Sequence, residues 1–391
     1  MQRTVSFIFI FILLCSSALS KRGHGRHRGK HNGGGRHHGD GRPHRGGRHH
    51  GGGRHHGGHK RPGGHPNWYD EVSENNCPGV ERRRLDSRVV TAAKEELKCK
   101  LFLERPDRYA TTVRIVFHDC VGGCDGCINR DNHDNAGFMF DSLEVMDRIY
   151  EESYKHAMSR ADFYVLTGVT ALEESLQFNN ANLSSSSIQP VRINYRYGRC
   201  DCSSSPSTTV QRDFPGGHFG YQQVMQFFRK EFGFNEKESV AIMGAHTLGG
   251  ASGATGSGFE GFWKEDGVAA ARLNNRYYSL LTNSSLTWRN IDRSVTTGLG
   301  EERWQWEAGA TPEGTPAPFM LNTDISLIRN IQPGVGGDHL VSSSPVHCPP
   351  QPGMCRSLQA MGTSGSGSLS RSGIKWLPRE PGSSDILIKY I

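Results

Sequence analysis

The stretch that decides the fold is Arg114-Ile115-Val116-Phe117-His118-Asp119-Cys120. Arg114 and His118 are four residues apart, so on an α-helix they share one face and lie one turn from each other. Phe117 flanks the same face. A cation, an imidazole and an aromatic ring over one patch suit polar chemistry beside a flat cofactor. Taken alone, the stretch is equally compatible with a helix end at which His118 only caps or packs.

Apolar residues at helical spacing predict a mainly α-helical domain around this stretch. The helix that contains residues 114–118 should end before Gly122 and Gly123. Strand signals are few, and residues 191–195 give the clearest one. The other predicted helices cover residues 88–103, 138–150, 161–176, 221–232 and 237–248.

Residues 1–20 predict a secretory signal peptide. Arg3 precedes an apolar run over residues 5–15, and small residues follow up to Ser20. The apolar run is too short to span a membrane comfortably. We therefore expect a secreted, extracellular protein with no membrane partner. Glycosylation motifs at Asn182 and Asn283 would be used on that route.

Residues 21–66 form a basic tail of Gly, His and Arg. They contain twelve Lys or Arg residues, one acidic residue and twelve of the nineteen histidines. Without aliphatic or aromatic residues the tail cannot build a core, so we expect it to be disordered. It is either a solvated linker or an anchor that binds metal ions through imidazoles and polyanions through arginines. A secretory route argues against nucleic acid as a natural partner.

The remaining chain divides by composition at about residue 335. Residues 67–335 have ordinary globular composition, whereas residues 336–391 form an extension rich in Ser, Gly and Pro that we expect to be poorly structured.

Ten cysteines are present, and Cys15 leaves with the signal peptide. Outside the cell most of the other nine should be paired, and the odd number implies one free thiol or an intermolecular bond. Cys120, Cys124 and Cys127 have the spacing of a radical-SAM iron–sulfur loop. Such a cluster needs reduced thiols inside a cell, so we exclude that class of enzyme.

Six motifs in the right order resemble those of the plant, fungal and bacterial haem peroxidases. Residues 114–120 resemble the distal helix, and Gly244-Ala245-His246-Thr247-Leu248-Gly249 resembles the proximal helix. The resemblance covers roughly residues 85–335. It implies a two-lobed helical fold with haem between a distal part, about 85–210, and a proximal part, about 211–335. The other four motifs lie at residues 135–138, 161–166, 198–201 and 321–324.

The resemblance also implies roles for single residues. His246 would bind the haem iron, and Asp324 would accept its second ring proton, which makes the imidazole more basic. On the distal side, His118 would act as the base for hydrogen peroxide, with Asn135 holding its other ring nitrogen. Arg114 would stabilise the charge that builds as the O–O bond breaks.

Aromatic and cysteine residues point to different subclasses. Phe117, the distal aromatic residue, resembles secreted peroxidases, whereas intracellular members usually carry Trp there. Cys120 and Cys124 would pair, as their counterparts do in plant secreted enzymes. Trp263 instead resembles the Trp near the proximal histidine of intracellular members, where it either hosts a radical or only packs. We therefore assign no subclass.

Calcium is a candidate second cofactor on the distal side. In secreted members the Asp after the distal histidine, a Gly carbonyl, a later Asp and a Ser hold a calcium ion. Asp119, Gly123 and Asp125 match, but Cys127 stands at the serine position. Calcium prefers oxygen ligands, so a thiol is a poor replacement.

A proximal cation site is also implied by the resemblance. Thr247 fits such a site, with Asp266 and Asn274 as candidate partners. An asparagine at the last position lowers the charge of the site, which leaves potassium or no ion as the options.

The resemblance implies a secreted haem peroxidase that reduces hydrogen peroxide and oxidises small phenol-like donors in one-electron steps. The alternative is an extracellular matrix or mineral-associated protein that binds metal or polyanions through residues 21–66 and keeps an inactive peroxidase scaffold. The intact set of catalytic residues argues against an inert scaffold.

Overall fold

The computed structural model describes only part of the chain. The chain divides into two units, Met1–Asn67 and Trp68–Ile391, and every described residue belongs to the second unit. The predicted signal peptide, tail and C-terminal extension lie outside the described residues, as do Asn182 and Asp266. The described residues are 69–71, 85–135, 137, 139–181, 193–251, 258–264, 267–293, 304–309, 316–329 and 331.

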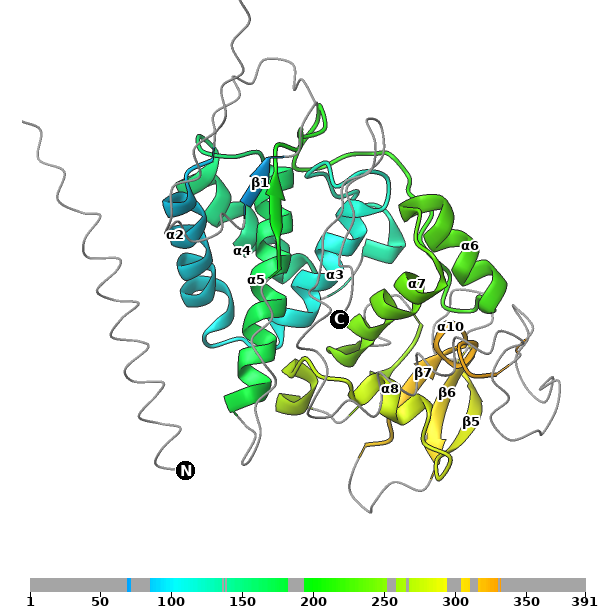
Figure 1. The fold of residues 1–391 in the computed structure, drawn as a ribbon. Coiled ribbons are helices and arrows are strands. Elements are labelled where there is room, and N and C mark those ends of the chain that lie inside the picture. The colour runs from blue at the N-terminus through cyan, green and yellow to red at the C-terminus, as the bar shows by residue number, and fades with distance from the viewer. Residues whose placement is uncertain are drawn as a thin grey trace, which may run out of the picture. The chain divides into compact units, whose positions relative to one another are not determined.

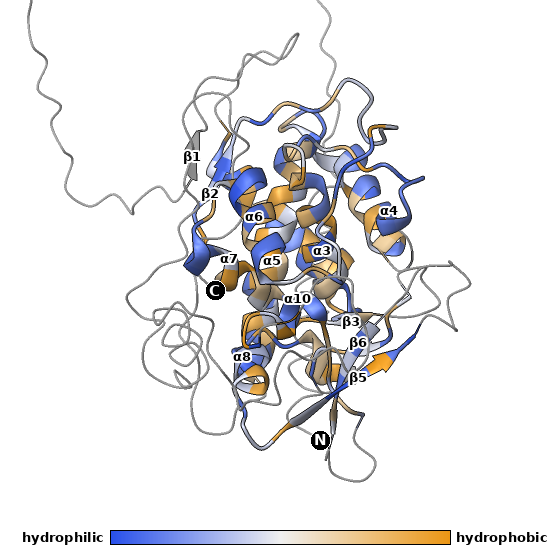
Figure 2. Cartoon of the chain, turned by 90° about the vertical axis from the view of Figure 1, so that its right-hand side faces the viewer, coloured by the Kyte–Doolittle hydropathy of each residue, from blue (hydrophilic) through white to orange (hydrophobic). Residues whose placement is uncertain are grey.

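Helices dominate the described fold (Figure 1), which confirms the mainly α prediction. In Figure 2, α3, α4 and α6 each carry both hydrophobic and hydrophilic colouring, as expected for helices with one buried face. Within the described residues, no helix is both long and apolar enough to cross a lipid bilayer. The helices are α2 (Ser87–Leu97), α3 (Arg108–Cys120), α4 (Met139–Ile149), α5 (Arg160–Ala181), α6 (Tyr221–Phe232), α7 (Glu236–Met243), α8 (Arg276–Leu281) and α10 (Asn322–Ile325).

Short helical turns of other types extend or link these helices. Two π-helical turns directly continue the helices before them, namely η1 (Lys98–Phe102) after α2 and η3 (Tyr150–Tyr154) after α4. The 3₁₀ turns are η2 (His133–Asn135), η4 (Gly244–Thr247) and η6 (Gly267–Ala271).

The predicted helix over residues 237–248 is only partly right. The α-helical part ends at Met243, and the chain continues as the 3₁₀ turn η4. Tyr278 lies at this point, and its hydroxyl shares its single proton between the carbonyl oxygens of Val240 and Ala241, at 2.9 and 3.0 Å. In a longer α-helix these two oxygens would accept the next N–H groups of the helix itself.

The strands differ most from the sequence prediction. The strand predicted at 191–195 is instead β2 (Tyr195–Tyr197), which pairs in parallel with β1 (Tyr69–Glu71). The sequence also missed an antiparallel sheet, in which polar residues interrupt the apolar alternation that predicts strands. Its order is β5 (Thr287–Asp292), β6 (Trp304–Gly309) and β7 (Phe319–Leu321), and a shorter pair joins β3 (Gly250–Ala251) to β4 (Gly261–Phe262).

Helix α3 packs directly on α5 in the centre of the domain, as Figures 1 and 2 both show. A Cβ atom at Gly168 of α5 would lie 2.9 Å from Cγ2 and 3.2 Å from Cβ of Val116 on α3. The two helices are therefore closer than a side chain at this position would allow. The contact fixes α3, and with it the Arg114 and His118 side chains, against the described helix that contains the most buried residues.

A buried ion pair joins two of the sequence motifs. The Asp162 carboxylate, on α5, accepts the guanidinium of Arg199 at 3.0 Å and the backbone N–H of Gly198 at 2.6 Å. Asp201 accepts the N–H groups of Arg160 and Ala161, which begin α5. Because the first N–H groups of a helix lack partners within it, Asp201 caps α5 from a distant part of the chain.

Replacing Gly168 with alanine should destabilise the domain, although alanine is the better helix former. Helix propensity alone favours alanine by about 1 kcal/mol, whereas an extra methyl group in a packed contact costs about 1–3 kcal/mol. The nearest atoms include Cβ of Val116, so the backbones must move apart. Thermal unfolding of Gly168→Ala measures the effect, with Gln177→Ala at an exposed position of α5 as the control. A more stable Gly168→Ala protein would contradict the close packing.

Candidate active site

One face of helix α3 carries side chains that are only partly buried. Ala110, Arg114 and Phe117 are spaced by four and three residues and remain partly exposed, while most of their neighbours are buried. This spacing corresponds to one side of an α-helix. The predicted placement of Arg114 and Phe117 on one face is therefore seen in the structure, with His118 next to them.

His118 is held at its Nδ1 atom by Asn135. The two side chains meet at 2.6 Å, between His118 Nδ1 and Asn135 Oδ1. Asn135 in turn donates its Nδ2 to the carbonyl oxygen of Asn129 at 2.7 Å, so Oδ1 must be the atom that faces the ring. An amide oxygen only accepts hydrogen bonds, so His118 carries its proton on Nδ1 and leaves Nε2 as a lone pair.

The surroundings of His118 keep the ring neutral. Burial and, secondly, the charge of Arg114 lower the pKa of His118 to about 3, although the hydrogen bond to Asn135 opposes the shift. Arg114 Nε faces His118 Nε2 at 3.5 Å, and Arg114 also donates to the carbonyl oxygen of Asp134 at 2.7 Å. A neutral imidazole whose Nε2 lone pair accepts only this long hydrogen bond from Arg114 can accept a proton from a bound molecule.

Aromatic rings fix the orientation of His118 from two sides. Phe214 stacks on the imidazole with ring centroids 4.1 Å apart, and Phe117 meets it edge-on at 5.9 Å. Phe117 also contacts Phe228 and Phe232 of α6. The sequence prediction missed Phe214, because a single Phe in a loop carries no signal of which ring it will contact.

His246, in the turn η4, is held in the same way. Its Nδ1 atom lies 2.8 Å from Oδ1 of the fully buried Asp324. The other carboxylate oxygen of Asp324 accepts the backbone N–H of Leu321 at 2.8 Å. A carboxylate only accepts, so the His246 proton is on Nδ1. Within the described residues nothing is bonded to Nε2, and the His246 side chain is 32% exposed.

Two aromatic residues complete the surroundings of His246. Trp263 stacks on the ring, with centroids 4.0 Å apart and planes 4° from parallel, and Phe319 lies behind Trp263. Tyr277 is fully buried and donates its hydroxyl to the same Oδ1 atom of Asp324 at 2.8 Å. Burial, and then the charge of Asp324, raise the pKa of Tyr277, so it remains a donor. The sequence prediction did not include Tyr277.

The residues present fit a haem group. Its iron takes an imidazole nitrogen as axial ligand, and such a ligand usually donates its other ring N–H to a carboxylate. His246 meets both conditions, because Asp324 holds Nδ1 and Nε2 is partly exposed.

At the two candidate cation sites, the predicted ligand residues that the structure describes already interact with other protein groups. Asp125 forms an ion pair with Arg212 at 2.7 Å. Asp119 is fully buried, and burial together with the charge of Asp125 raises its pKa to about 8. On the proximal side Thr247 donates to Oδ1 of Asn274 at 3.1 Å.

Two disulfides show how four of the cysteines are paired. Cys120 pairs with Cys124, as the resemblance implied, and Cys127 pairs with Cys202. No cysteine among the described residues is free. The three cysteines of the iron–sulfur spacing are therefore not available as thiolates, which agrees with the exclusion of that class.

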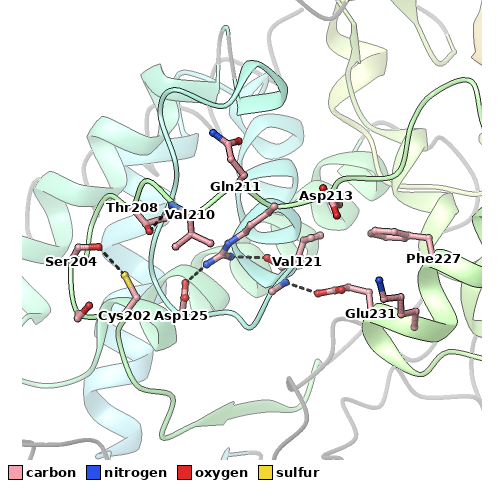
Figure 3. Close-up of a pocket in the computed structure, with 14 residues that line it drawn as sticks. Val121, Asp125, Cys202, Ser204, Thr208, Val210, Gln211, Asp213, Phe227 and Glu231 are labelled. Atoms are coloured by element: carbon pink, nitrogen blue, oxygen red, sulfur yellow. Dashed lines mark hydrogen bonds and ion pairs between the residues drawn. The ribbon is translucent and has the colours of Figure 1, made fainter.

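A surface cavity of about 390 Å³ lies beside the first turn after α3 (Figure 3). Val121, Asp125, Val210, Arg212 and Phe227 are among its lining residues. Neither His118 nor His246 lines it, so the cavity is separate from the two histidines described above.

Comparison with known proteins identifies similar chains. The sequence model of one protein family, described as Peroxidase, matches residues 90–332. The mitochondrial cytochrome c peroxidase of Neurospora crassa is 29% identical over 175 residues, which are 44% of this chain and 38% of the relative. The corresponding protein of Yarrowia lipolytica is 31% identical over 170 residues, with 44% and 41% covered. That of Candida glabrata is 30% identical over 232 residues, with 56% and 55% covered. The chain thus spans less than two thirds of the length of each relative.

The buried, neutral His118 should make the protein less stable in acid. Its pKa of about 3 lies below the ordinary 6.5. Between these values the unfolded chain binds up to one more proton than the folded chain, so the free energy of unfolding decreases by up to about 1.4 kcal/mol for each unit by which the pH is lowered. The contribution is fully present above pH 6.5 and is lost toward pH 3.

Thermal unfolding of the wild type and of His118→Gln between pH 7 and pH 4 measures this effect. Glutamine does not titrate, so the stability of the wild type relative to the variant should fall steadily as the solution is acidified. A difference between the two proteins that stays constant over this range would show that His118 is not kept neutral by burial.

Proposed function

The chain belongs to the peroxidase family, and we propose that it is a haem enzyme that reduces hydrogen peroxide with electrons from an external donor. One observation carries this proposal. Both His118 and His246 are held at Nδ1 by a buried oxygen acceptor, Asn135 in one case and Asp324 in the other. Each histidine therefore offers Nε2, one as a base and the other as a ligand for iron.

When bound, the haem iron supplies the redox chemistry and the position at which the peroxide is held. His118 accepts a proton from the peroxide on Nε2 and returns it to the leaving oxygen. The low pKa of His118 supports this role, because the ring is neutral before the reaction at any physiological pH. Asn135 fixes the tautomer throughout, since it accepts the Nδ1 proton.

Arg114 stabilises the negative charge that develops as the O–O bond breaks. Its guanidinium lies beside Nε2 of His118 and is anchored to the carbonyl oxygen of Asp134. A cation fixed before the reaction costs no reorganisation during it, which is the usual source of such stabilisation.

On the proximal side, Asp324 makes His246 a more basic ligand, and Trp263 supports the ring by stacking. The stacking contact of Trp263 with His246 gives an electron a short route to or from the proximal ligand. We propose small phenol-like donors as the reducing substrates. The names of the relatives raise cytochrome c as the competing donor, and steady-state rates with 2-methoxyphenol and with reduced cytochrome c separate the two.

We also propose that the protein is secreted and that residues 21–66 localise it. The two disulfides and the exposed position of the Asn283 glycosylation motif support an oxidising route. The relatives named above are described as mitochondrial. Expression in a eukaryotic host decides between the locations, because a secreted and glycosylated product would support our proposal.

The tail-centred alternative makes a different prediction. A matrix or mineral-binding protein would be retained on heparin or immobilised metal through residues 21–66 and would show no peroxide chemistry. Retention of the full chain and of a chain without these residues tests the tail, independently of the haem.

The absorption spectrum of the purified full chain tests the proposed function directly. We expect a Soret band that shifts after one equivalent of hydrogen peroxide and returns after a reducing donor is added. A chain that gives no Soret band even after incubation with haem would contradict the proposal.

His118→Ala should keep the Soret band and lose the fast reaction with peroxide. Removing a positioned base lowers the rate by about 10²-fold or more. The matched control is His156→Ala, an exposed histidine after α4, which should leave the rate unchanged. Stopped-flow measurement of the Soret shift gives both rates, and an unchanged rate in His118→Ala would remove His118 from the mechanism.

Tyr277→Phe should lower the reduction potential of the bound haem. Without the tyrosine hydroxyl, Oδ1 of Asp324 accepts only from His246, which becomes more basic and favours the oxidised iron. One hydrogen bond is worth about 1 kcal/mol, which is about 40 mV for a one-electron couple. Redox titration measures the shift, with Tyr150→Phe, whose hydroxyl bonds to the Met158 carbonyl, as the control. An equal or higher potential would show that Tyr277 does not compete for Asp324.

A further inference from the structure

We propose that two side chains, Arg212 and Lys264, fill the cation sites that the peroxidase resemblance implies, so that the protein holds its site together without calcium or potassium. The inference concerns the supports of the site rather than the reaction, and it can be tested even if the proposed function fails. It rests on the contacts of the two side chains with the oxygen atoms that a metal ion would need.

On the distal side, the guanidinium of Arg212 lies among oxygens of the loop that follows His118. It donates to the carbonyl oxygens of Asp119 and Val121 at 2.5 and 2.7 Å, and to Oδ1 of Asp125 at 2.7 Å. Figure 3 shows Val121 and Asp125 at the ends of these contacts. A guanidinium is a planar cation with several donors, so it can bind several oxygens at once.

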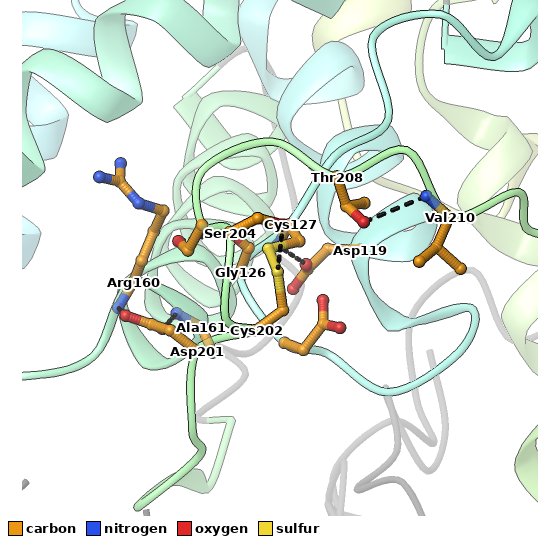
Figure 4. The surroundings of a disulfide bond; sticks show 12 residues. Asp119, Gly126, Cys127, Arg160, Ala161, Asp201, Cys202, Ser204, Thr208 and Val210 are labelled. Carbon is orange, nitrogen blue, oxygen red and sulfur yellow. Dashed lines mark hydrogen bonds between the residues drawn. A yellow bond between two sulfur atoms is a disulfide. The ribbon is translucent and has the colours of Figure 1, made fainter. Parts of the chain in front are cut away.

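Most of the oxygens that calcium would need on this side already accept hydrogen bonds. Oδ1 of Asp119 accepts the backbone N–H of Cys127 at 3.0 Å, which leaves only Oδ2 of that carboxylate without a partner in the described structure. Cys127, at the position of the calcium-binding serine, is bonded to Cys202 (Figure 4) and offers no hydroxyl. Calcium takes about six to eight oxygen ligands, so the site does not fit the ion.

On the proximal side, the ammonium group of Lys264 takes the equivalent place. Lys264 is 1% exposed, and its Nζ donates to the carbonyl oxygen of Arg272 and to Oδ1 of Asn274. The same Oδ1 atom accepts the hydroxyl of Thr247 at 3.1 Å and the backbone N–H of Arg276 at 3.0 Å. The Asn274 oxygen is therefore surrounded by donors, and Thr247 uses its hydroxyl to donate rather than to bind an ion.

The internal cations, or residues in their hydrogen-bond networks, lie close in the chain to candidate active-site residues. Asp119 follows His118, Thr247 follows His246, and Lys264 follows Trp263. Arg212 also precedes by two residues the Phe214 ring that stacks on His118. A covalently attached cation cannot dissociate, so these contacts do not depend on the metal concentration outside the protein. Among the described residues no three His, Cys, Asp or Glu side chains converge on a metal site.

The first test uses the unchanged full chain. We expect elemental analysis of the purified protein to find no stoichiometric calcium, and we expect EGTA to leave Tm and the Soret band unchanged. Added calcium or potassium chloride, compared with sodium chloride at equal ionic strength, should not raise Tm either. Stoichiometric calcium, or a Tm that falls in EGTA and recovers with calcium, would overturn the distal half of the proposal. A specific rise with potassium would overturn the proximal half.

The second test removes the distal cation. Arg212→Ala leaves buried oxygens and a partly buried carboxylate without their partner, so Tm should fall by about 5 °C or more. Calcium chloride should now raise Tm, because the oxygens have become available. Lys230→Ala is the matched control, since it removes the same charge from the same cavity (Figure 3) at an exposed position that makes no hydrogen bond in the described structure.

Arg212→Lys keeps the folded protein testable if the alanine variant does not fold. Lysine preserves the charge but not the planar set of donors. The Tm of Arg212→Lys should therefore lie between those of the wild type and Arg212→Ala. If Arg212→Ala does not fold, Arg212→Lys should still fold, with a Tm below that of the wild type. Arg212 variants as stable as Lys230→Ala would overturn the distal half. For the proximal half, Lys264→Met should lower Tm by about 5 °C or more, and an unchanged Tm would overturn it. Haem binding is not needed for any of these measurements of unfolding and metal content.

Discussion

The candidate site depends on one arrangement that occurs twice, a histidine held at Nδ1 by a buried oxygen acceptor. On the distal side the acceptor is the amide of Asn135, and on the proximal side it is the carboxylate of Asp324. The difference between the acceptors matters chemically. A neutral amide fixes the tautomer of His118 without attracting a second proton, whereas a carboxylate makes His246 electron-rich. The same residue type can therefore serve as a base on one side and as an iron ligand on the other.

The rest of the domain keeps these two histidines in place through contacts between distant parts of the chain. Helix α3 is fixed against α5 at the Gly168 contact, and α5 is capped by Asp201. The loop that carries Phe214 is joined to the end of α3 by Arg212, and the Cys127–Cys202 disulfide joins it to the segment that follows α3. Because these contacts are buried and specific, the site is supported by the fold rather than by its own short segments.

The chain combines features of different branches of its family. Phe117, the Cys120–Cys124 disulfide and the matching residues Asp119 and Asp125 resemble secreted members, whereas Trp263 resembles intracellular members. The relatives reported above are fungal cytochrome c peroxidases, each covered over less than two thirds of its length. The proposed internal cations would account for this combination, since Arg212 and Lys264 contact the oxygens that bound ions would otherwise need.

The sequence by itself determined the helical fold and the residues of the two histidine motifs. Helical spacing predicted where α2 to α6 lie, although α3 begins six residues earlier and α5 ends five residues later than predicted, because each of these helices satisfies its own backbone hydrogen bonds and most bury one face. The motifs also named the pairs His118–Asn135 and His246–Asp324, whose contacts the structure contains. These features depend on residue type and local spacing, which a sequence records directly.

Only the tertiary structure decided which distant side chains complete the site. Tyr277 reaches Asp324, Phe214 reaches His118, and Arg212 reaches the carbonyl oxygen of Asp119 across long separations in the chain. The β5–β6–β7 sheet and the turn η4 are equally tertiary, since the first needs cross-strand partners and the second follows a helix end that the Tyr278 hydroxyl contacts. Such contacts depend on how whole elements pack. The local sequence around Tyr277, Phe214 or Arg212 does not indicate which distant residue each side chain will contact.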